Sequence, residues 1–357
     1  MPIMSHPSIR GRGASYNPPN RFDRIEIERE DWVEAGDPPP QNQYFKDASR
    51  SIIARNNSPD VGFEASVNPY RGCDRSCIYC YARPGHEYFG LSAGLDFETK
   101  IFVKEDAPEL LRKELASPKW KPQILVMSGV TDPYQSIEKR MKITRRCLEV
   151  LAEFRNPVSM ITKSHLVTRD ADILGDLAGD NAAAVNLSIT SLRNEVQRVM
   201  EPRAATPARR LDAIRKLTDA GVPCGVMVGP VVPGLTDHEM PAILEAAAEA
   251  GAIRAGYIML RLPHAVKELF DDWLQRHFPD RRRKVLSRLK DLHGGPLYDA
   301  RYGIRMRGEG PFAEQVERMF EIGCRKAGLN EVPLRLSTAA FRRPEDSVPV
   351  GPQLGLF

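Results

Sequence analysis

Short apolar runs alternate with amphipathic stretches through the middle of the chain, from about residue 65 to residue 262. Each run is long enough for one strand, and unbroken apolar character is typical of parallel strands that are covered on both faces. Six runs fit this description, of which the first is the weakest: residues 65–71, 123–129, 157–163, 183–190, 223–229 and 255–261. We therefore predict six buried parallel strands.

Amphipathic stretches between these runs predict helices at residues 106–117, 138–154, 206–221 and 236–251. In the third stretch Thr206 suits an N-cap, Pro207 suits the first helical position and Gly221 ends the helix. In the fourth, Thr236 and Glu239 have the spacing of a capping box. Strands and helices that alternate in this way require right-handed parallel crossovers, so the fold class is α/β.

Two architectures fit this alternation, a doubly wound open sheet and a partial barrel. A cysteine-rich loop follows the first expected strand, and in barrels the carboxyl ends of the strands carry the chemistry. We therefore favour a partial (β/α)6 TIM-like barrel over residues 61–262. Residues 1–60 are rich in Pro, Asn, Arg and Asp and predict an extended, loosely ordered N-terminal arm. Residues 263–340 predict a helical cap and C-terminal segment, and residues 341–357 a flexible tail.

Composition narrows the class of protein. The 357 residues carry 51 basic and 47 acidic side chains, a net charge of +4 that allows a nucleic-acid partner without requiring one. No apolar run approaches the roughly 20 residues that span a bilayer. The first residues, MPIMSHPSIRGRG, lack the apolar core of a secretory signal. We expect a cytoplasmic protein whose six cysteines are reduced thiols or metal ligands.

Three cysteines cluster in the stretch RGCDRSCIYCYARPG, at Cys73, Cys77 and Cys80. Three thiolates can hold three irons of a 4Fe-4S cluster and leave the fourth iron open for a substrate or cofactor. The alternative is a structural zinc site that His86 completes. Against zinc, the stretch lacks the second, distant ligand pair that is usual in zinc ribbons and knuckles.

This CxxxCxxC motif, followed by an aromatic residue and a six-fold strand-helix repeat, resembles the signature of the radical S-adenosylmethionine (radical SAM) superfamily. The resemblance implies that the three cysteines ligate a 4Fe-4S cluster and that S-adenosylmethionine chelates the open iron. It further implies that one electron splits the sulfonium to give a 5'-deoxyadenosyl radical, which abstracts hydrogen from a substrate. An external donor such as flavodoxin or ferredoxin would supply the electron.

Residues 65–262 also resemble the spore photoproduct lyase branch of that superfamily and its uncharacterised bacterial relatives. The resemblance implies that Tyr79 and Tyr81, on either side of the third cysteine, take part in hydrogen-atom return, and that Tyr79 also lines the cofactor. It also implies that Lys163, in ITKSH, binds the carboxylate of the cofactor and that Ser188, in NLSIT, contacts its ribose. The loop SGVTDPYQ would receive the amino group through Ser128, Gly129 and Thr131. Without the resemblance, Lys163 would read as a solvated lysine at a strand end.

One feature departs from the lyase, which has a hydrogen-donating cysteine in the loop after the second strand. Here that loop reads VMSGVTDPYQ and contains no cysteine, so cleavage of spore photoproduct by that route is not expected. Cys147 and Cys324 are expected to be small core residues. Cys224 opens the fifth expected strand and is either core filling or, if it points into the barrel, a hydrogen donor.

The expected substrate is a nucleic-acid base, as in DNA repair, with lyase-like chemistry. Two arginine-containing segments provide candidate phosphate contacts, and Tyr302 provides a stacking platform. The arginines concerned are Arg203, Arg209, Arg301, Arg305 and Arg307. One alternative is radical modification of RNA or a small metabolite. An alternative of another class is a non-catalytic zinc module that binds nucleic acid.

The last five residues, QLGLF, resemble the bacterial sliding-clamp-binding motif. In that motif a glutamine comes first, and leucine and a terminal aromatic residue enter an apolar groove. The resemblance assigns these roles to Gln353, Leu354, Leu356 and Phe357. The alternative is a tail that folds back and buries the three apolar side chains on its own domain.

Overall fold

The computed structural model describes residues 6–23 and 38–344. Six parallel strands lie side by side in chain order in its main sheet. They are β3 (Ala65–Val67), β6 (Leu125–Met127), β7 (Val158–Thr162), β8 (Ala183–Ser188), β9 (Cys224–Val231) and β10 (Arg254–Met259). Each falls on one of the six expected runs. A doubly wound sheet would reverse its strand order part-way, so the sequential order confirms the partial barrel.

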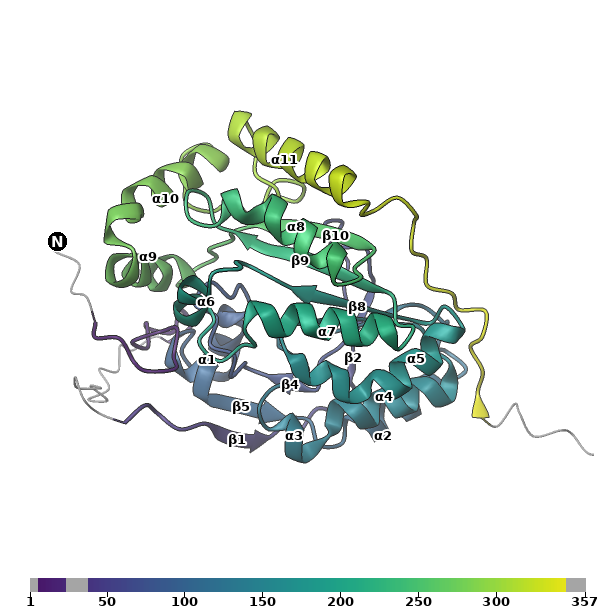
Figure 1. The fold of residues 1–357 in the computed structure, drawn as a ribbon. Coiled ribbons are helices and arrows are strands. Elements are labelled where there is room, and N and C mark those ends of the chain that lie inside the picture. Colours follow the sequence, from purple (N-terminus) through teal and green to yellow (C-terminus); the bar gives the residue numbers. More distant parts are fainter. Residues whose placement is uncertain (1–5, 24–37, 345–357) are drawn as a thin grey trace, which may run out of the picture.

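One antiparallel strand, β2 (Ile53–Arg55), extends this sheet beyond β3. Helices cover the outer face of the sheet (Figure 1). They are α2 (Ala107–Ala116), α4 (Ile143–Phe154), α5 (Ala171–Gly179), α7 (Pro207–Asp219) and α8 (Met240–Glu249). The shorter helical pieces are η1 (Arg83–Phe89), α1 (Leu95–Thr99), α3 (Glu138–Met141), η2 (His165–Asp170), α6 (Asn194–Met200) and η3 (Asp237–Glu239). Within the described ranges no helix has the length and apolar character needed to cross a bilayer.

Two of the expected helix boundaries differ from the structure. The helix expected over residues 138–154 is divided into α3 and α4, because Lys142 adopts a left-handed conformation with φ 51°. The predicted capping box is wrong. The Thr236 hydroxyl accepts from the Val232 amide at 3.0 Å, and α8 begins only at Met240. Glu239 instead accepts from Ser191 at 2.8 Å and so fastens the loop that follows β8.

A second, three-stranded sheet joins the N-terminal region to the cysteine loop. In it β1 (Gln43–Lys46) runs parallel to β5 (Lys100–Val103), which pairs antiparallel with β4 (Tyr70–Arg71). Residues 6–23 lie against the same region, where the backbone amides of Gly13 and Ala14 donate to the Glu98 carboxylate at 3.1 and 2.8 Å. This part of the N-terminal arm therefore packs behind the cysteine loop.

After the last barrel strand the chain forms α9 (Val266–His277), α10 (Pro279–Leu292) and α11 (Pro311–Ala327). Figure 1 shows α11 beside α8, and from there the yellow chain runs back along the molecule. On this return the Ser337 amide donates to the Asn181 carbonyl and the Arg342 amide to the Phe154 carbonyl, both at 2.9 Å. These carbonyls precede β8 and β7, so the returning segment crosses the amino ends of the strands.

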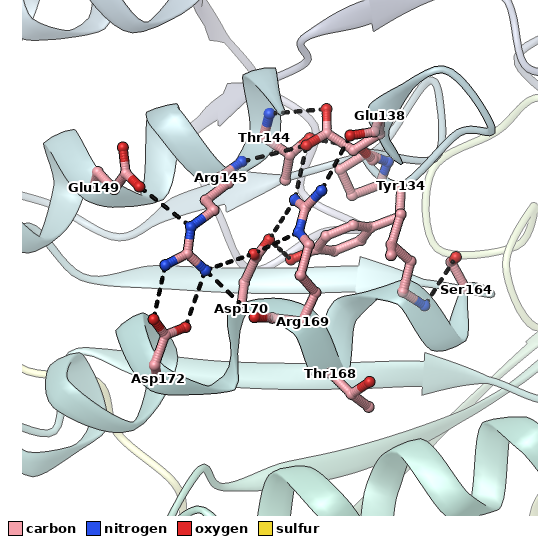
Figure 2. A network of polar contacts seen from close by, with 12 residues as sticks. Tyr134, Glu138, Thr144, Arg145, Glu149, Ser164, Thr168, Arg169, Asp170 and Asp172 are labelled. Atoms are coloured by element: carbon pink, nitrogen blue, oxygen red, sulfur yellow. Dashed lines mark hydrogen bonds and ion pairs between the residues drawn. The ribbon is translucent and has the colours of Figure 1, made fainter. Parts of the chain in front are cut away.

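A buried ionic network ties the loops after β6 and β7 to the helices outside them (Figure 2). The Tyr134 hydroxyl donates to Asp170 at 3.1 Å, and Arg169 bridges Asp170 and Glu138 at 2.8 Å each. Arg145 adds an ion pair to Asp170 at 3.0 Å. The carboxylates of Glu138 and Asp170 are fully buried. Buried charges of this kind need every partner in place, so the network holds both loops in fixed positions.

Candidate active site

The carboxyl ends of the six parallel strands open into one pocket with about 1000 Å³ of empty space, its open mouth included. Segments from the cysteine loop and from all the strands after β3 line its wall. The residues are Cys73, Arg75, Cys77, Tyr79, Cys80, Tyr81, Ser128, Gly129, Val130, Thr131, Asp132, Ile161, Thr162, Lys163, Ser188, Met227, Gly229, Pro230, Ile258, Met259 and Arg261. The structure thus brings together every residue that the sequence assigned to the cluster and the cofactor.

The three cysteines share this pocket wall. Gly72, which precedes the first of them, has φ 76°, and a Cβ there would meet the His86 ring at 2.8 Å, so both backbone and space require glycine. Burial raises the pKa of Cys77 to about 12 and that of Cys73 well above its usual value, to which Asp132 also contributes. Such thiols stay protonated unless a metal centre displaces their protons. The donor set therefore suits a bound metal cluster better than a free reactive thiol.

A buried charged pair supports the cysteine loop from behind. Arg83 donates to the Cys77 carbonyl at 2.8 Å, to the carbonyls of Ala93 and Gly94, and to the Glu98 carboxylate. Both side chains of the pair are fully buried. With its charge paired and its guanidinium donors occupied, Arg83 fixes the position of the loop.

His86 does not join the three cysteines. Its ring is buried, packs edge-on against Phe97 and Phe102, and lies against Gly72. Its Nε2 lies 2.9 Å from the Lys100 carbonyl. Among residues 6–23 and 38–344, no three His, Cys, Asp or Glu side chains stand close enough to share one metal ion. A 4Fe-4S cluster makes a different demand, because each thiolate binds its own iron.

The loop after β6 is hydrogen-bonded to the cysteine loop. The Thr131 hydroxyl and the Gln135 side-chain amide donate to the Gly72 carbonyl at 2.6 and 3.1 Å. Ser128 and Gly129 both have φ 121°, and the Ser128 hydroxyl donates to the Thr131 carbonyl at 2.7 Å. The loop is therefore a tight turn, fixed by these hydrogen bonds, and its residues Ser128 to Asp132 line the pocket.

Lys163, directly after β7, is positioned by Asp132. The buried Asp132 carboxylate accepts from the Lys163 amide at 2.9 Å and from the Thr162 hydroxyl at 2.8 Å. The Lys163 ammonium lies 5.8 Å from the centre of the Tyr79 ring. This lysine faces the pocket and is not simply a solvated strand end. In the sequence Asp132 stands within the SGVTDPYQ loop, but no local pattern indicates that its carboxylate positions Lys163.

Tyr79 is anchored by a buried carboxylate. Its hydroxyl donates to Glu201, which also accepts from the Thr190 hydroxyl at 2.7 Å and from Arg210. Arg210 in turn donates to the Ser188 carbonyl at 2.8 Å. Burial acts to raise the pKa of Glu201, but Arg210 and Lys163 outweigh it, and the pKa is lowered. The network therefore fixes the Tyr79 ring and the end of β8 together.

Tyr81 stands at the mouth of the pocket, 45% exposed. The Tyr81 hydroxyl donates to the Gly129 carbonyl. The Arg261 guanidinium lies over the Tyr81 ring, 4.8 Å from the centre of the ring. Partial burial of the Tyr81 side chain and the neighbouring Cys80 raise the pKa of Tyr81 above its usual value, although Arg261 and Arg305 act to lower it. The phenol therefore keeps its hydrogen at neutral pH, as a hydrogen-atom donor must.

The expected nucleic-acid contacts are spread over two regions and several already have partners. Arg203 lies beside the cysteine loop, where its carbonyl accepts from Arg75 at 2.9 Å. Arg301 pairs with Asp299 at 2.6 Å. The other three candidate arginines also have neighbours. Arg209 contacts His165, and the Arg307 guanidinium lies over the Tyr257 ring. Arg305 forms an ion pair with Asp60, and its guanidinium lies over the exposed Tyr302 ring. The assigned tail residues, Gln353 to Phe357, lie outside the described residues.

The remaining cysteines are buried in the core, as the sequence predicted for Cys147 and Cys324. Cys224 is 1% exposed at the amino end of β9, and its thiol faces the Val222 carbonyl at 3.4 Å. The pocket lies at the opposite end of that strand. Core filling is therefore the role of Cys224, and the alternative of a hydrogen donor is wrong.

A family model described as the radical SAM superfamily matches residues 67–247, just over half of the 357-residue chain. The chain belongs to the radical SAM superfamily. An uncharacterised protein of Mycobacterium tuberculosis strain H37Rv is 34% identical over 254 residues, which cover 70% of this chain and 74% of that protein. An uncharacterised protein of Methanocaldococcus jannaschii is 30% identical over 178 residues, which cover 50% of this chain and 64% of that protein.

Solved structures of spore photoproduct lyase share the fold of this radical SAM protein. The lyase complexed with dinucleoside spore photoproduct superposes with a TM-score of 0.55 over 80% of both chains, at 17% identity. A mutant of the same lyase with bound AdoMet and dinucleoside spore photoproduct also gives a TM-score of 0.55. The chain is a radical SAM enzyme whose cofactors are a 4Fe-4S cluster and S-adenosylmethionine. Its three cysteines, of which Cys73 and Cys77 are buried, line a pocket with the Lys163 ammonium nearby and fit that pair of cofactors.

Proposed function

We propose that this cytoplasmic radical SAM enzyme abstracts a hydrogen atom from a nucleic-acid base, in a DNA-repair reaction related to that of spore photoproduct lyase. The observation that carries the proposal is the shared pocket, in which the cysteine triad, Lys163, Ser188 and Tyr81 meet at the carboxyl ends of the strands. The solved lyase with the same fold holds a dinucleoside, which supports a base as the substrate.

Each pocket residue has a role in this proposal. Cys73, Cys77 and Cys80 would hold the cluster, which together with S-adenosylmethionine supplies the radical chemistry. Lys163 would bind the cofactor carboxylate as a point charge, and Ser188 would contact its ribose. The tight turn of Ser128, Gly129 and Thr131 would accept the amino group. The surrounding apolar side chains would exclude water from the reacting atoms.

Return of hydrogen to the product is assigned to Tyr81. The segment 128–135 contains no cysteine, and Cys224 lies at the far end of its strand, so neither supplies a thiol at the pocket. The Tyr79 side chain is only 7% exposed and its hydroxyl donates to the buried Glu201, whereas the Tyr81 hydroxyl donates to the Gly129 carbonyl at the pocket mouth. The protonated Tyr81 phenol lies at the open mouth, where a substrate can reach it. The reaction would therefore differ from that of spore photoproduct lyase in the group that returns hydrogen.

The test is anaerobic reconstitution of the full chain with iron and sulfide, followed by incubation with S-adenosylmethionine and dithionite. We expect a brown protein with about four irons per chain that forms 5'-deoxyadenosine. Cys77→Ala should abolish that product, whereas Cys224→Ala, a buried cysteine away from the pocket, should retain it. If Cys77→Ala kept full production of the nucleoside, the assigned ligand set would be wrong.

Two protein partners belong to the proposal. An electron donor such as flavodoxin or ferredoxin would reduce the cluster. The QLGLF sequence, Gln353 to Phe357, would bring the enzyme to DNA by binding a bacterial sliding clamp. A segment this short binds through a few apolar anchors, and we expect modest affinity.

A further inference from the structure

Arg261 occupies a distinct place in the pocket. It follows β10, the last barrel strand, and its guanidinium covers the Tyr81 ring at the mouth. Lys163 covers the other tyrosine, Tyr79, deeper in the pocket. Two of the three cationic side chains in the pocket wall, Lys163 and Arg261, are therefore each held over a different aromatic ring.

In the part of the chain that the structure describes, the Arg261 guanidinium has no anionic partner. Within the described residues no carboxylate lies within ion-pair distance of it, and its buried Nε has no hydrogen-bond partner. Its Nη1 faces the Met306 sulfur at 3.3 Å, which is a weak acceptor. Asp60 is near enough to feel its charge, but that carboxylate already binds Arg305 and the Gly303 amide.

Arg75, the other arginine of the pocket wall, differs from Arg261 in having a counter-ion, although its buried Nε also lacks a hydrogen-bond partner. Its Nε lies 3.8 Å from the Asp74 carboxylate, and its Nη1 donates to the Arg203 carbonyl at 2.9 Å. A guanidinium with an unsatisfied, buried donor is costly, and such a group in a folded protein calls for an explanation such as an absent ligand. Arg261 and Arg75 both meet this description at Nε, but among the described residues only Arg75 has a carboxylate within ion-pair distance, so Arg261 is the one that lacks an anion.

We propose that Arg261 binds a phosphate of the nucleotide strand whose base enters the pocket beside Tyr81. The inference rests on the proposed nucleic-acid substrate and adds the residue that recognises it. A planar guanidinium can donate two parallel hydrogen bonds to a phosphate, a geometry that an ammonium lacks. Lys163 remains for the cofactor carboxylate, so the two cations serve two different anions.

A neighbouring surface fits the same strand. The Met259 amide donates to the Met306 carbonyl at 2.9 Å, which holds the segment before Met306 beside the end of β10. In that segment the Tyr302 ring is 57% exposed, with the Arg305 guanidinium 4.5 Å from its centre. An exposed ring of this kind can stack a flanking base while Arg261 holds the phosphate between them.

The test measures binding of a fluorescein-labelled single-stranded oligothymidylate to the reconstituted full chain, by anisotropy over a series of salt concentrations. Arg261→Gln should weaken binding about tenfold, the loss expected for one charge-assisted contact. It should also reduce the slope of log K against log salt by about 0.7, because one phosphate contact disappears. Arg261→Lys should keep most of the slope but lose affinity, since the charge remains without the paired donors.

Arg254→Gln is the matched control. Arg254 opens the same strand at its other end, is exposed and donates to the Leu334 carbonyl at 3.0 Å. Its replacement should leave affinity and slope unchanged. Suppose that wild type binds the oligonucleotide, and that the Arg261→Gln variant melts at the same temperature and has the same affinity and the same salt slope as wild type. The Arg261 assignment is then overturned, while the proposed function stands. If wild type forms 5'-deoxyadenosine but binds no oligonucleotide, the nucleic-acid substrate itself is wrong.

Discussion

Replacing Glu201 by alanine removes the carboxylate that anchors Tyr79 and pairs with Arg210. Both charged side chains are 1% exposed. The substitution therefore leaves a buried guanidinium without its counter-ion, and the Tyr79 hydroxyl without its acceptor. Removing one partner of a buried pair typically costs about 3–5 kcal/mol. Arg210 keeps its bonds to the carbonyls of Ser188 and Ala205, so the lower end of that range is the better expectation.

This cost converts into a measurable change of melting temperature. At about 2.1 cal/mol/K per residue, unfolding 357 residues has an entropy of about 0.75 kcal/mol/K. A loss of about 3–5 kcal/mol then lowers the melting temperature of Glu201→Ala by about 4–7 °C. Circular dichroism melting of the cluster-free chain measures this shift without interference from iron loading.

A second substitution tests the cause. In Glu201→Ala/Arg210→Met the uncompensated charge is gone, and an apolar side chain of similar length takes its place. Replacing both members of a buried pair by apolar residues is often nearly neutral, so the double variant should recover most of the lost stability. A double variant no more stable than Glu201→Ala, or a single variant that melts within about 1 °C of wild type, would refute the reasoning.

The pKa of Glu201 gives the same prediction a pH dependence. The folded pKa is lowered below the ordinary 4.5, because Arg210 and Lys163 outweigh the effect of burial. The ionised carboxylate thus contributes stability that is fully present above pH 4.5 and is lost as pH falls through the folded pKa. The stability difference between wild type and Glu201→Gln should therefore be constant near neutrality and shrink below pH 4.5. A difference that grew on acidification would contradict the sign of the shift.

Two further predictions concern the chain ends. A Cβ at Gly13 would collide with the Ser76 carbonyl in the cysteine loop, so Gly13→Ala should destabilise the loop by about 1–3 kcal/mol and lower the iron content after reconstitution. Gly62→Ala, where a Cβ meets nothing within 4 Å, should match wild type, and equal iron content in both variants would contradict the packing role. Deleting residues 353–357 should abolish co-migration with a bacterial sliding clamp on a sizing column, and unchanged co-migration would end the clamp assignment.

The barrel strands could be predicted because burial on both faces leaves an unbroken apolar run that is visible in one short window. The site residues at the strand ends, Lys163 and Ser188, were implied by the resemblance to the spore photoproduct lyase branch, and both line the same pocket as the cysteines. The break at Lys142 was missed because a single left-handed residue leaves the apolar spacing of the two helices on either side nearly unchanged.

Contacts between distant parts of the chain have no such local signal. Gly13 and Ala14 bind Glu98, 85 and 84 residues away, through backbone amides that any sequence supplies. Tyr79 reaches Glu201 across 122 residues. Glu239 has the spacing of a capping residue, yet its carboxylate accepts a hydrogen bond from the distant Ser191 hydroxyl instead. In each case one long-range acceptor decides the outcome, and neither composition nor periodicity records it.

The charges around the pocket divide into two kinds, and the division predicts how they respond to substitution. Arg83 and Arg210 are fully buried and paired with carboxylates, because a buried charge without a partner costs several kcal/mol. Lys163 and Arg261 face the pocket, and among the described residues no carboxylate lies within ion-pair distance of either. Substituting a cation of the first kind should lower stability, whereas substituting one of the second kind should lower ligand affinity and leave the melting temperature nearly unchanged. Glu201→Ala removes the partner of the buried cation Arg210, and Arg261→Gln removes a cation that faces the pocket. Comparing the two variants therefore distinguishes the residues that stabilise the pocket from those that bind its ligands.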